Sequence, residues 1–386
     1  MPTLLTRPFV LLTIAHFLQA LGFATMTMLP LYLDHLGASR SQVGVIMAAN
    51  AFGGLLLRPA VGWSLDALGR KPTLVAGTLV LVAAMLMVGF VDRIGPLILS
   101  VRLLIGVGGG ALFTGYFAFA ADLIPEKRRT EGIALFGISG LLPLALNPFF
   151  GELGLEAPDL RWFYPAVGIA IASSLLFVRS LEEPNLSRPR QPVRAAEVIA
   201  ALRSPPLWSV WLATVVFAGL VATFMAFSTV TAASRGVDRS TALWLTYAAG
   251  AVGVRLFGAR LPDRLGTANM VAPALGLYGA AMLLSASATT TAGFLIAGLL
   301  AGLGHGSCFP VLTSQVISRS PERLRGSALA MFTAIWELSS VTLTPAFGLL
   351  ADATDDRTMF AAVAACAACG VALWAAVEHR VQPRVP

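Results

Sequence analysis

Apolar runs long enough to cross a bilayer, which takes roughly 20 residues per helix, alternate with short polar turns along the whole chain. The pattern predicts twelve spanning helices. Because the turns are short, neighbouring helices are expected to be antiparallel. The predicted spans lie near residues 9–33, 41–64, 73–91, 97–120, 131–155, 162–181, 206–233, 240–260, 268–287, 291–317, 326–351 and 358–378.

The composition agrees with a polytopic membrane protein. Of 386 residues, 56% are hydrophobic and only 12% are charged, whereas soluble domains carry about 25% charged residues. The chain contains no phosphate-cradling loop or nucleophile constellation. Its C-x-x-C pair, Cys366 and Cys369, lies in an apolar run without polar neighbours, which favours a packing role over metal or redox chemistry. We therefore expect an all-α membrane protein that is not an enzyme, with no cofactor and no metal.

One connection is longer and more polar than the others. It runs from Glu182 to Pro205 and is rich in Pro and Arg, a composition typical of linkers. It predicts an N-terminal six-helix bundle at 1–181, a cytoplasmic linker at 182–205 and a C-terminal six-helix bundle at 206–386.

The two predicted halves share a polar hinge. The stretch RPAVGWSLDALGRK at 58–71 returns as RLFGARLPDRLG at 255–266. Arg, Asp and Gly recur at one shift of 197 positions, which indicates an internal duplication. The matched residues are Arg58 with Arg255, Asp66 with Asp263 and Gly69 with Gly266.

Basic residues gather on one side of the predicted membrane. With the N-terminus inside, twenty Lys and Arg lie on the inner side and six on the outer side, while Arg102 lies within a span. This asymmetry predicts a multi-pass inner (plasma) membrane protein with both termini in the cytoplasm. It also explains the net charge of +7 without nucleic acid as a partner.

With these features together, the chain resembles the major facilitator superfamily over nearly its whole length. The hinge GWSLDALGRK is close to that family's signature G-x-L-x-D-x-x-G-R-R/K, with Ser64 at the usual Leu position and Leu65 before Asp66. The resemblance implies two pseudo-symmetric six-helix bundles, a central cavity and alternating access. It also implies a monomer in the lipid bilayer.

Charged residues are absent from the cores of predicted spans three, six, nine and twelve, which the fold would turn toward lipid. Glu337 lies about eleven residues into span eleven, near mid-membrane by the helical rise. An ionisable group at that depth is costly and should face protein or water. We expect Glu337 to load and release a proton with His305 as its partner; a structural hydrogen bond between helices is the alternative.

Arg102 opens span four in an R-x-x-x-G setting with Gly106. By resemblance, such an Arg lies near a proton path. Asp34, at the outer end of span one, is either its ion-pair partner or a solvated loop residue.

Further polar and aromatic residues fall in the predicted bundle interior. His16 and Gln19 are one turn apart and share a helix face, so they either contact substrate or form a packing hydrogen bond. Asn147 precedes Pro148, which removes a backbone hydrogen bond and breaks span five. The full set predicted to line a substrate cavity is His16, Gln19, Asn50, Tyr116, Asn147, Phe224 and Trp336.

The hinge residues have a mechanical interpretation. A carboxylate near a helix N-terminus is favoured by the helix dipole. The resemblance implies that Asp66 meets the start of span eleven and Asp263 the start of span five, closing the cytoplasmic side; alternatively, the hinges only fix loop topology. The predicted gating residues are Arg58, Gly62, Asp66, Gly69, Arg70, Arg255 and Asp263.

A predicted cavity rich in Phe, Met and Trp with few charges favours proton-coupled export of hydrophobic or amphipathic small molecules. Two alternatives stay open: a proton-coupled importer of a specific polar metabolite, and a lipid translocase. Exporters of the family often carry a Gly-Pro pair in span five, where this chain has Pro143, Asn147, Pro148 and Gly151. That departure weakens the antiporter assignment.

Overall fold

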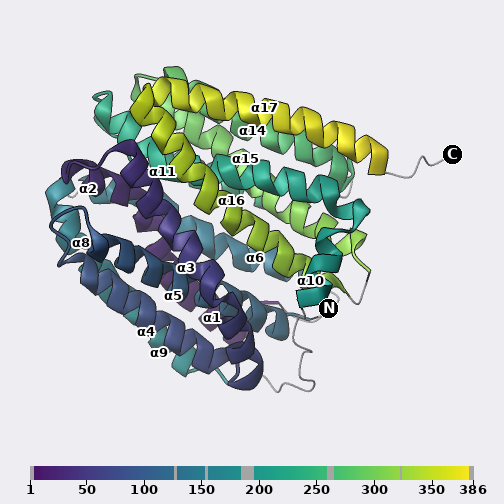
Figure 1. Cartoon of the computed structure of the whole chain (residues 1–386). Coiled ribbons are helices and arrows are strands. Elements are labelled where there is room, and N and C mark those ends of the chain that lie inside the picture. Colours follow the sequence, from purple (N-terminus) through teal and green to yellow (C-terminus); the bar gives the residue numbers. More distant parts are fainter. Residues whose placement is uncertain are drawn as a thin grey trace. The chain divides into compact units, whose positions relative to one another are not determined.

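All regular secondary structure that the computed structural model describes is helical (Figure 1). The described residues are 4–125, 128–152, 155–183, 195–258, 265–321 and 324–381. The predicted all-α fold is therefore confirmed.

The chain divides into two compact units. Unit 1 comprises Met1–Ser39 and Ile46–Pro192, and unit 2 comprises Arg40–Val45 and Val193–Pro386. The short segment Arg40–Val45 begins the third helix, so that helix starts in unit 2 and continues in unit 1.

The described residues of unit 1 form the helices α1 to α9 and short 3₁₀ turns, written η. They are α1 (Arg7–Thr25), η1 (Met26–Met28), α2 (Leu29–His35), α3 (Arg40–Ala67, from Ile46 onward), α4 (Arg70–Val88), α5 (Pro96–Leu123), α6 (Arg129–Leu141), η3 (Leu142–Leu146), α7 (Asn147–Glu152), η4 (Ala157–Asp159), α8 (Leu160–Ala172) and α9 (Ser174–Arg179).

Unit 2 contains the remaining elements, most of them long. They are α10 (Ala195–Leu202), η5 (Pro205–Leu207), α11 (Trp208–Ser234), α12 (Leu243–Phe257), α14 (Thr267–Ser287), α15 (Thr291–Arg319), α16 (Arg325–Ala353) and α17 (Asp356–Val381).

Ten helical segments of the described residues are long and apolar enough to cross a membrane. Two shorter apolar segments, Leu135–Phe150 and Leu243–Phe257, coincide with the predicted spans near 131–155 and 240–260. Each of the twelve predicted spans thus has an apolar helical segment, although two of these are shorter than a full crossing.

The internal repeat is visible in the backbone. Gly69 and Gly266, paired by the sequence repeat, both have positive φ, of 105° and 84°, and each immediately precedes a helix, α4 or α14. Glycine adopts this conformation without the steric penalty of a Cβ atom. The two halves therefore share the same turn before their third spanning helix.

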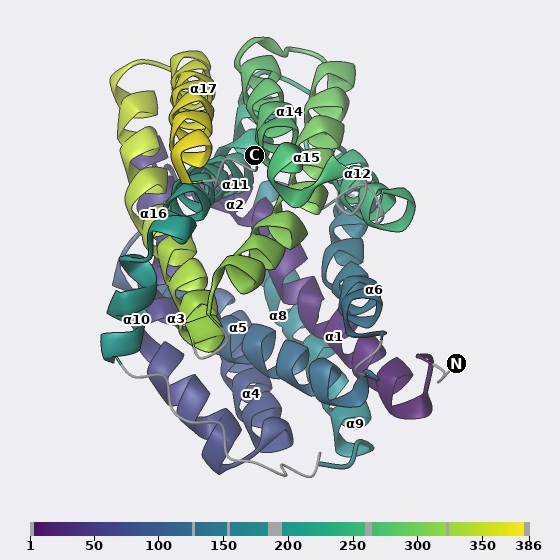
Figure 2. The same ribbon diagram turned by 90° about the vertical axis from the view of Figure 1, so that its right-hand side faces the viewer.

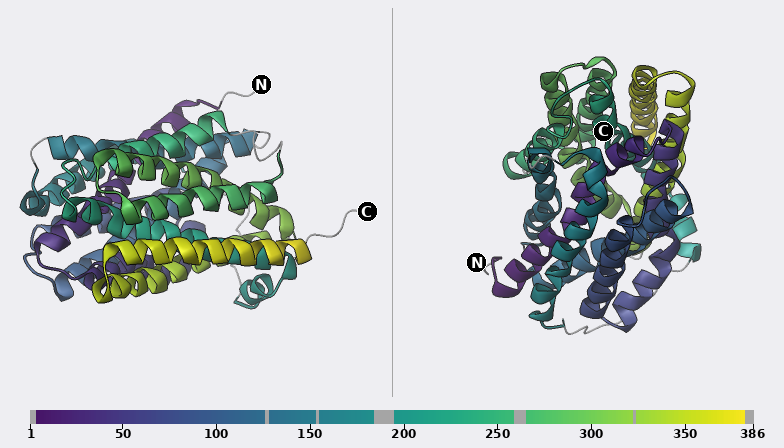
Figure 3. Two further views of the ribbon diagram at one scale, coloured as in Figure 1. Left: turned by 90° about the horizontal axis from the view of Figure 1, so that it is seen from above. Right: turned by 90° about the vertical axis from the view of Figure 1, so that its left-hand side faces the viewer.

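Helix packing within each unit follows a related plan. In unit 1, α4 packs against α5 and α8 (Figure 2). In unit 2, α14 packs against α15 and α17, and Figure 3 shows α17 in yellow. The third spanning helix of each unit is thus held by the fourth and the sixth.

Glycines let two further helix pairs, α3 with α5 and α12 with α15, approach closely. A Cβ on Gly106 of α5 would overlap the Asn50 carbonyl oxygen of α3. In unit 2, a Cβ on Gly302 of α15 would overlap the Tyr247 carbonyl oxygen of α12. In both places there is no room for a Cβ atom, so these helix pairs can lie this close only because the residue is glycine.

We predict that Gly106→Ala lowers the thermal unfolding temperature of the purified protein. The new methyl group meets backbone, which cannot rotate away, and such overpacking costs about 1–3 kcal/mol. Gly109→Ala on the same helix is the matched control, because a Cβ there meets nothing within 4 Å. Equal unfolding temperatures for the two variants would contradict the close approach.

Candidate functional site

The first spanning segment of unit 1 is broken. Helix α1 ends at Thr25, a 3₁₀ turn follows, and α2 begins at Leu29 with Pro30 in its first turn. Pro30 has no N–H to donate, so the Met26 carbonyl oxygen, four residues earlier, lacks its α-helical partner and accepts from the Leu29 N–H instead. Within a membrane, such a break needs polar groups from elsewhere.

Asn147 contacts the polar groups at this break. It is the first residue of α7, directly after η3, where the fifth span is broken as well, and it is fully buried. Its Nδ2 donates to the Ala24 carbonyl oxygen at 3.0 Å and to Thr27 Oγ1 at 2.8 Å. Two interrupted helices therefore meet at one amide.

His16 lies in α1 among aromatic rings. Its Nδ1 is 2.7 Å from Ser139 Oγ, and Ser139 donates its own proton to the Phe136 carbonyl oxygen at 2.6 Å. The Ser139 hydroxyl thus links the His16 ring to the backbone of α6. The ring stacks on Phe136 at 4.6 Å and lies 5.2 Å from Tyr116 and 5.7 Å from Phe117.

Two further predicted cavity residues lie in unit 1. Gln19 is buried one turn beyond His16 in α1, and Asn50 is half-buried in α3 at the Gly106 crossing. Tyr116 is fully buried. The structure thus brings His16 and Tyr116 together. Asn147, from α7, contacts the break at Met26–Met28, which lies in the span that carries His16.

Arg102 is buried against α3. Its Nε donates to the Ile46 carbonyl oxygen at 3.2 Å and one terminal nitrogen donates to the Met47 carbonyl oxygen at 2.8 Å. Gly106, one turn along, packs on the same helix. Asp34 lies exposed near the end of α2, and its pairing with Arg102 stays a prediction.

In unit 2, His305 joins a chain of hydroxyl groups. Its Nδ1 is 2.5 Å from Tyr247 Oη, which is 3.4 Å from Tyr278 Oη. The three residues come from α15, α12 and α14 and are buried. Phe224 is also fully buried and stacks on Tyr247 at 5.9 Å.

An aromatic contact connects this chain to α16. The Phe217 ring lies 5.4 Å from His305 and 4.9 Å from Trp336. Glu337 follows Trp336 in the sequence and is half-buried. A shared aromatic neighbour therefore brings His305 near the α16 turn that carries Glu337, while the pairing of Glu337 with His305 itself stays a prediction.

The hinge of unit 1 involves a residue that sequence reasoning missed. Glu183 accepts hydrogen bonds from the backbone N–H groups of Arg70 and Lys71 at 2.5 and 2.8 Å, and so caps α4. A Cβ on Gly69 would lie 2.6 Å from Glu183 Oε1. Gly69 is therefore needed both for its φ and for room for this carboxylate.

Arg70 is fixed from the other side. Its Nε donates to Asp122 at 3.0 Å, a terminal nitrogen donates to the Leu65 carbonyl oxygen at 2.7 Å, and the side chain is 2% exposed. Asp122 lies at the end of α5, so this ion pair joins the start of α4 to the end of α5.

The other predicted gating residues are placed as follows. Arg58 in α3 and Arg255 in α12 are half-buried, and Gly62 has open space where a Cβ would be. Asp66 belongs to α3, but its side chain lies outside the described residues, as does the whole of Asp263.

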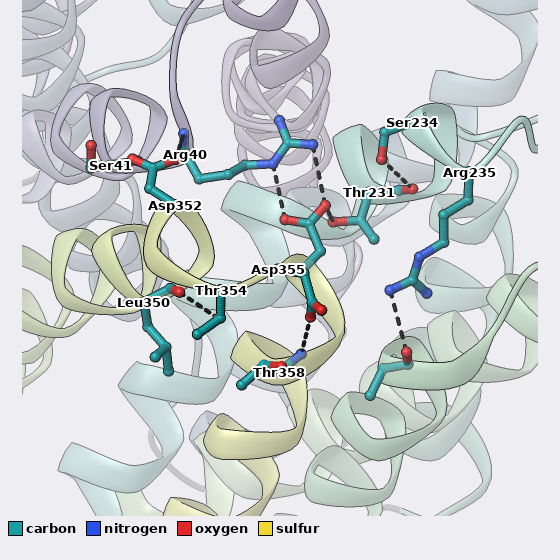
Figure 4. Close-up of polar contacts among 12 residues, drawn as sticks. Arg40, Ser41, Thr231, Ser234, Arg235, Leu350, Asp352, Thr354, Asp355 and Thr358 are labelled. Atoms are coloured by element: carbon teal, nitrogen blue, oxygen red, sulfur yellow. Dashed lines mark hydrogen bonds and ion pairs between the residues drawn. The ribbon is translucent and has the colours of Figure 1, made fainter.

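A second group that sequence reasoning missed lies within unit 2 (Figure 4). The Arg40 guanidinium pairs with both carboxylate oxygens of Asp356, at 3.0 and 3.2 Å, and Thr231 Oγ1 donates to the same carboxylate at 2.8 Å. The Asp352 carboxylate accepts from the backbone N–H groups of Arg40 and Ser41. In the sequence, the only indication of this group of contacts is the cluster of acidic residues in ADATDDR at 351–357.

Comparison with known proteins decides the family. The model of the Major Facilitator Superfamily matches residues 12–344 and 232–385. This chain belongs to the major facilitator superfamily. It is thus a multi-pass membrane protein of a transporter family, as the hinge motif predicted.

Relatives within this superfamily cover most of the chain. An uncharacterized MFS-type transporter of Salmonella typhimurium strain LT2, STM4428, is 27% identical over 90% of each chain. YhhS of Escherichia coli K12, also an uncharacterized MFS-type transporter, is 25% identical over 94% of this chain and 90% of its own. The multidrug resistance protein MdtL of Citrobacter koseri is 31% identical over 42% of this chain and 43% of its own.

Solved structures show the same fold. A mutant form of the nucleoside transporter NupG aligns with a TM-score of 0.82 at 13% identity, covering 96% of this chain and 99% of that chain. The human organic anion transporter MFSD10 aligns with a TM-score of 0.72 at 18% identity, covering 97% of this chain and 100% of that chain. At these identities the likeness concerns the fold alone.

We predict that Asp356→Asn destabilises this transporter by about 1–2 kcal/mol, because it weakens a bidentate ion pair whose side chains are only 15% and 14% exposed. Thermal unfolding in detergent measures the effect. Arg357→Gln, on the same turn but exposed, is the control and should change stability by less than about 0.5 kcal/mol.

A double-mutant cycle with Arg40→Gln completes this test. If the two side chains interact as the distances indicate, the double variant is less destabilised than the sum of the single variants. Strict additivity would show that the pair contributes nothing.

Proposed function

We propose that this transporter exports hydrophobic or amphipathic small molecules across the inner (plasma) membrane in exchange for protons, by alternating access. The observation that carries the proposal is a buried imidazole within an aromatic cluster in each unit. His16 lies beside Phe117 and Phe136, and His305 lies beside Phe217 and Tyr247.

The aromatic clusters support a lipophilic substrate. Aromatic rings offer large apolar surfaces that accept many shapes, and a small number of polar groups then orients the ligand. We propose that His16, Gln19, Asn50, Tyr116, Asn147, Phe224 and Trp336 contribute to substrate binding. The relatives named multidrug resistance protein MdtL support this substrate class, although they match less than half of the chain.

The titratable groups support proton coupling. An imidazole ring can bind and release a proton, and both histidines hold a hydrogen bond that orients the ring. We propose Glu337 and His305 as the groups that load and release the proton, and Arg102 with Asp34 as a charged pair that tunes them.

The hinges supply the proposed gating. Arg58, Gly62, Asp66, Gly69 and Arg70 act in unit 1, and Arg255 and Asp263 act in unit 2. The capping of α4 by Glu183 and the Arg70–Asp122 ion pair support a rigid hinge in unit 1. We further propose a monomer with both termini in the cytoplasm.

No observation specifically favours import of a polar metabolite or lipid translocation. The buried clusters offer few convergent charges for a polar metabolite, and the similarity to a nucleoside transporter, at 13% identity, concerns the fold alone.

We predict that Glu337→Gln slows ethidium transport driven by a pH gradient in liposomes by about tenfold or more, equal to roughly 1.4 kcal/mol on the limiting barrier. Gln keeps the shape of the side chain but cannot carry the proton. Ethidium exchange at equal pH on both sides should stay close to the rate of the unaltered protein, since exchange needs no net proton movement.

Glu337→Asp is the matched control, because it keeps a carboxyl group and should retain part of the gradient-driven rate. If Glu337→Gln transports at the unaltered rate under a pH gradient, Glu337 does not couple protons. If the unaltered protein transports no lipophilic cation but transports a polar metabolite, the proposal of export is wrong and proton-coupled import of that metabolite replaces it.

A further inference from the structure

One face of α15 carries polar groups at three levels along the bundle. His305, Cys308, Leu312, Gln315 and Arg319 follow one another at spacings of three and four residues, so they share a face. The first four are at most 9% exposed, and the Arg319 side chain is 17% exposed. This face therefore runs through the interior of unit 2.

Gln315 is the unusual member. It is 1% exposed, and neither its Oε1 nor its Nε2 has a hydrogen-bond partner among the described residues. A buried primary amide offers two donors and an acceptor, and leaving them all unpaired is costly. Buried polar groups without protein partners are typically satisfied by internal water.

Polar groups continue from Gln315 toward the middle of the span. Pro310 lies inside α15 and cannot donate to the Gly306 carbonyl oxygen, which lies four residues earlier. His305 comes next, about 15 Å from Gln315 along the helix, with Tyr247 and Tyr278 beyond it.

Polar groups also continue toward the end of the helix. Arg319, about 6 Å beyond Gln315 along the helix axis, pairs with Glu378 of α17 at 2.5 Å. Ser209 of α11 donates to the same carboxylate and accepts from Arg319 at 3.0 Å. This end of α15 is the one that the charge asymmetry predicts to face the cytoplasm.

We propose that Gln315 binds the internal water of a proton path between His305 and the Ser209–Arg319–Glu378 cluster. The path rests on the proposed proton-coupled function. The His305 imidazolium gives a proton to internal water on this face, successive waters past the Gly306 carbonyl oxygen carry it to the water at Gln315, and one proton passes to bulk water beyond the cluster. Gln315 stays neutral throughout and the ion pair is unchanged at the end.

The test uses the full-length protein in liposomes with ethidium as the probe. Gln315→Leu removes the water-binding amide while keeping much of the side-chain volume. Transport driven by a pH gradient should fall about tenfold, and ethidium exchange at equal pH should stay within about twofold, because only the first needs proton release to the cytoplasmic side.

Two further variants serve as controls for this result. Thr313→Val is the matched control on the same helix, since Thr313 donates only to the Phe309 carbonyl oxygen of its own helix, and both rates should be unchanged. Gln315→Asn keeps an amide and should recover a large part of the gradient-driven rate.

The outcomes separate the path from the function. If the unaltered protein shows no transport driven by a pH gradient, the proposed function fails. If it does, and Gln315→Leu matches it, the function stands and the path is overturned. Equal losses of driven transport and exchange in Gln315→Leu would make Gln315 a packing residue and would also overturn the path.

Discussion

The structure depends on the high cost of an unpaired polar group inside a membrane. A spanning helix satisfies its own backbone, but every interruption and every buried side-chain polar atom needs a partner from the protein or from internal water. Asn147 meets this need where α1 is interrupted, and Arg102 meets it through carbonyl oxygens of α3. Tyr247 does the same for His305. The candidate functional groups are therefore the ones that helix packing has to accommodate.

Duplication explains the shared architecture, and divergence explains the separate roles. Gly69 and Gly266 keep the same turn before α4 and α14. The first span of unit 1, by contrast, is interrupted at Met26–Met28, whereas α11, its counterpart in unit 2, is continuous from Trp208 to Ser234. Unit 1 thus carries the interrupted span that contacts Asn147, and unit 2 carries the His305–Tyr247–Tyr278 chain.

Sequence patterns predict features that lie within one helix or one turn. The spans, the hinge glycines and the burial of His16 and His305 follow from hydropathy and periodicity. Contacts between distant segments do not: Glu183 lies 113 positions from Arg70, and Asp356 lies 316 positions from Arg40. Such pairs depend on which helices become neighbours. The break at Met26 did have a local signal, Pro30, within an apolar run that predicted one continuous span.

The most direct test of proton-coupled export is proton release on substrate binding. Tetraphenylphosphonium is added to the purified protein in weakly buffered detergent solution, and the pH change is recorded at several starting values between about pH 6 and 8. Competition between substrate and proton predicts that binding releases protons and strengthens as the pH rises. Binding of the cation without any proton release across this range would contradict the account.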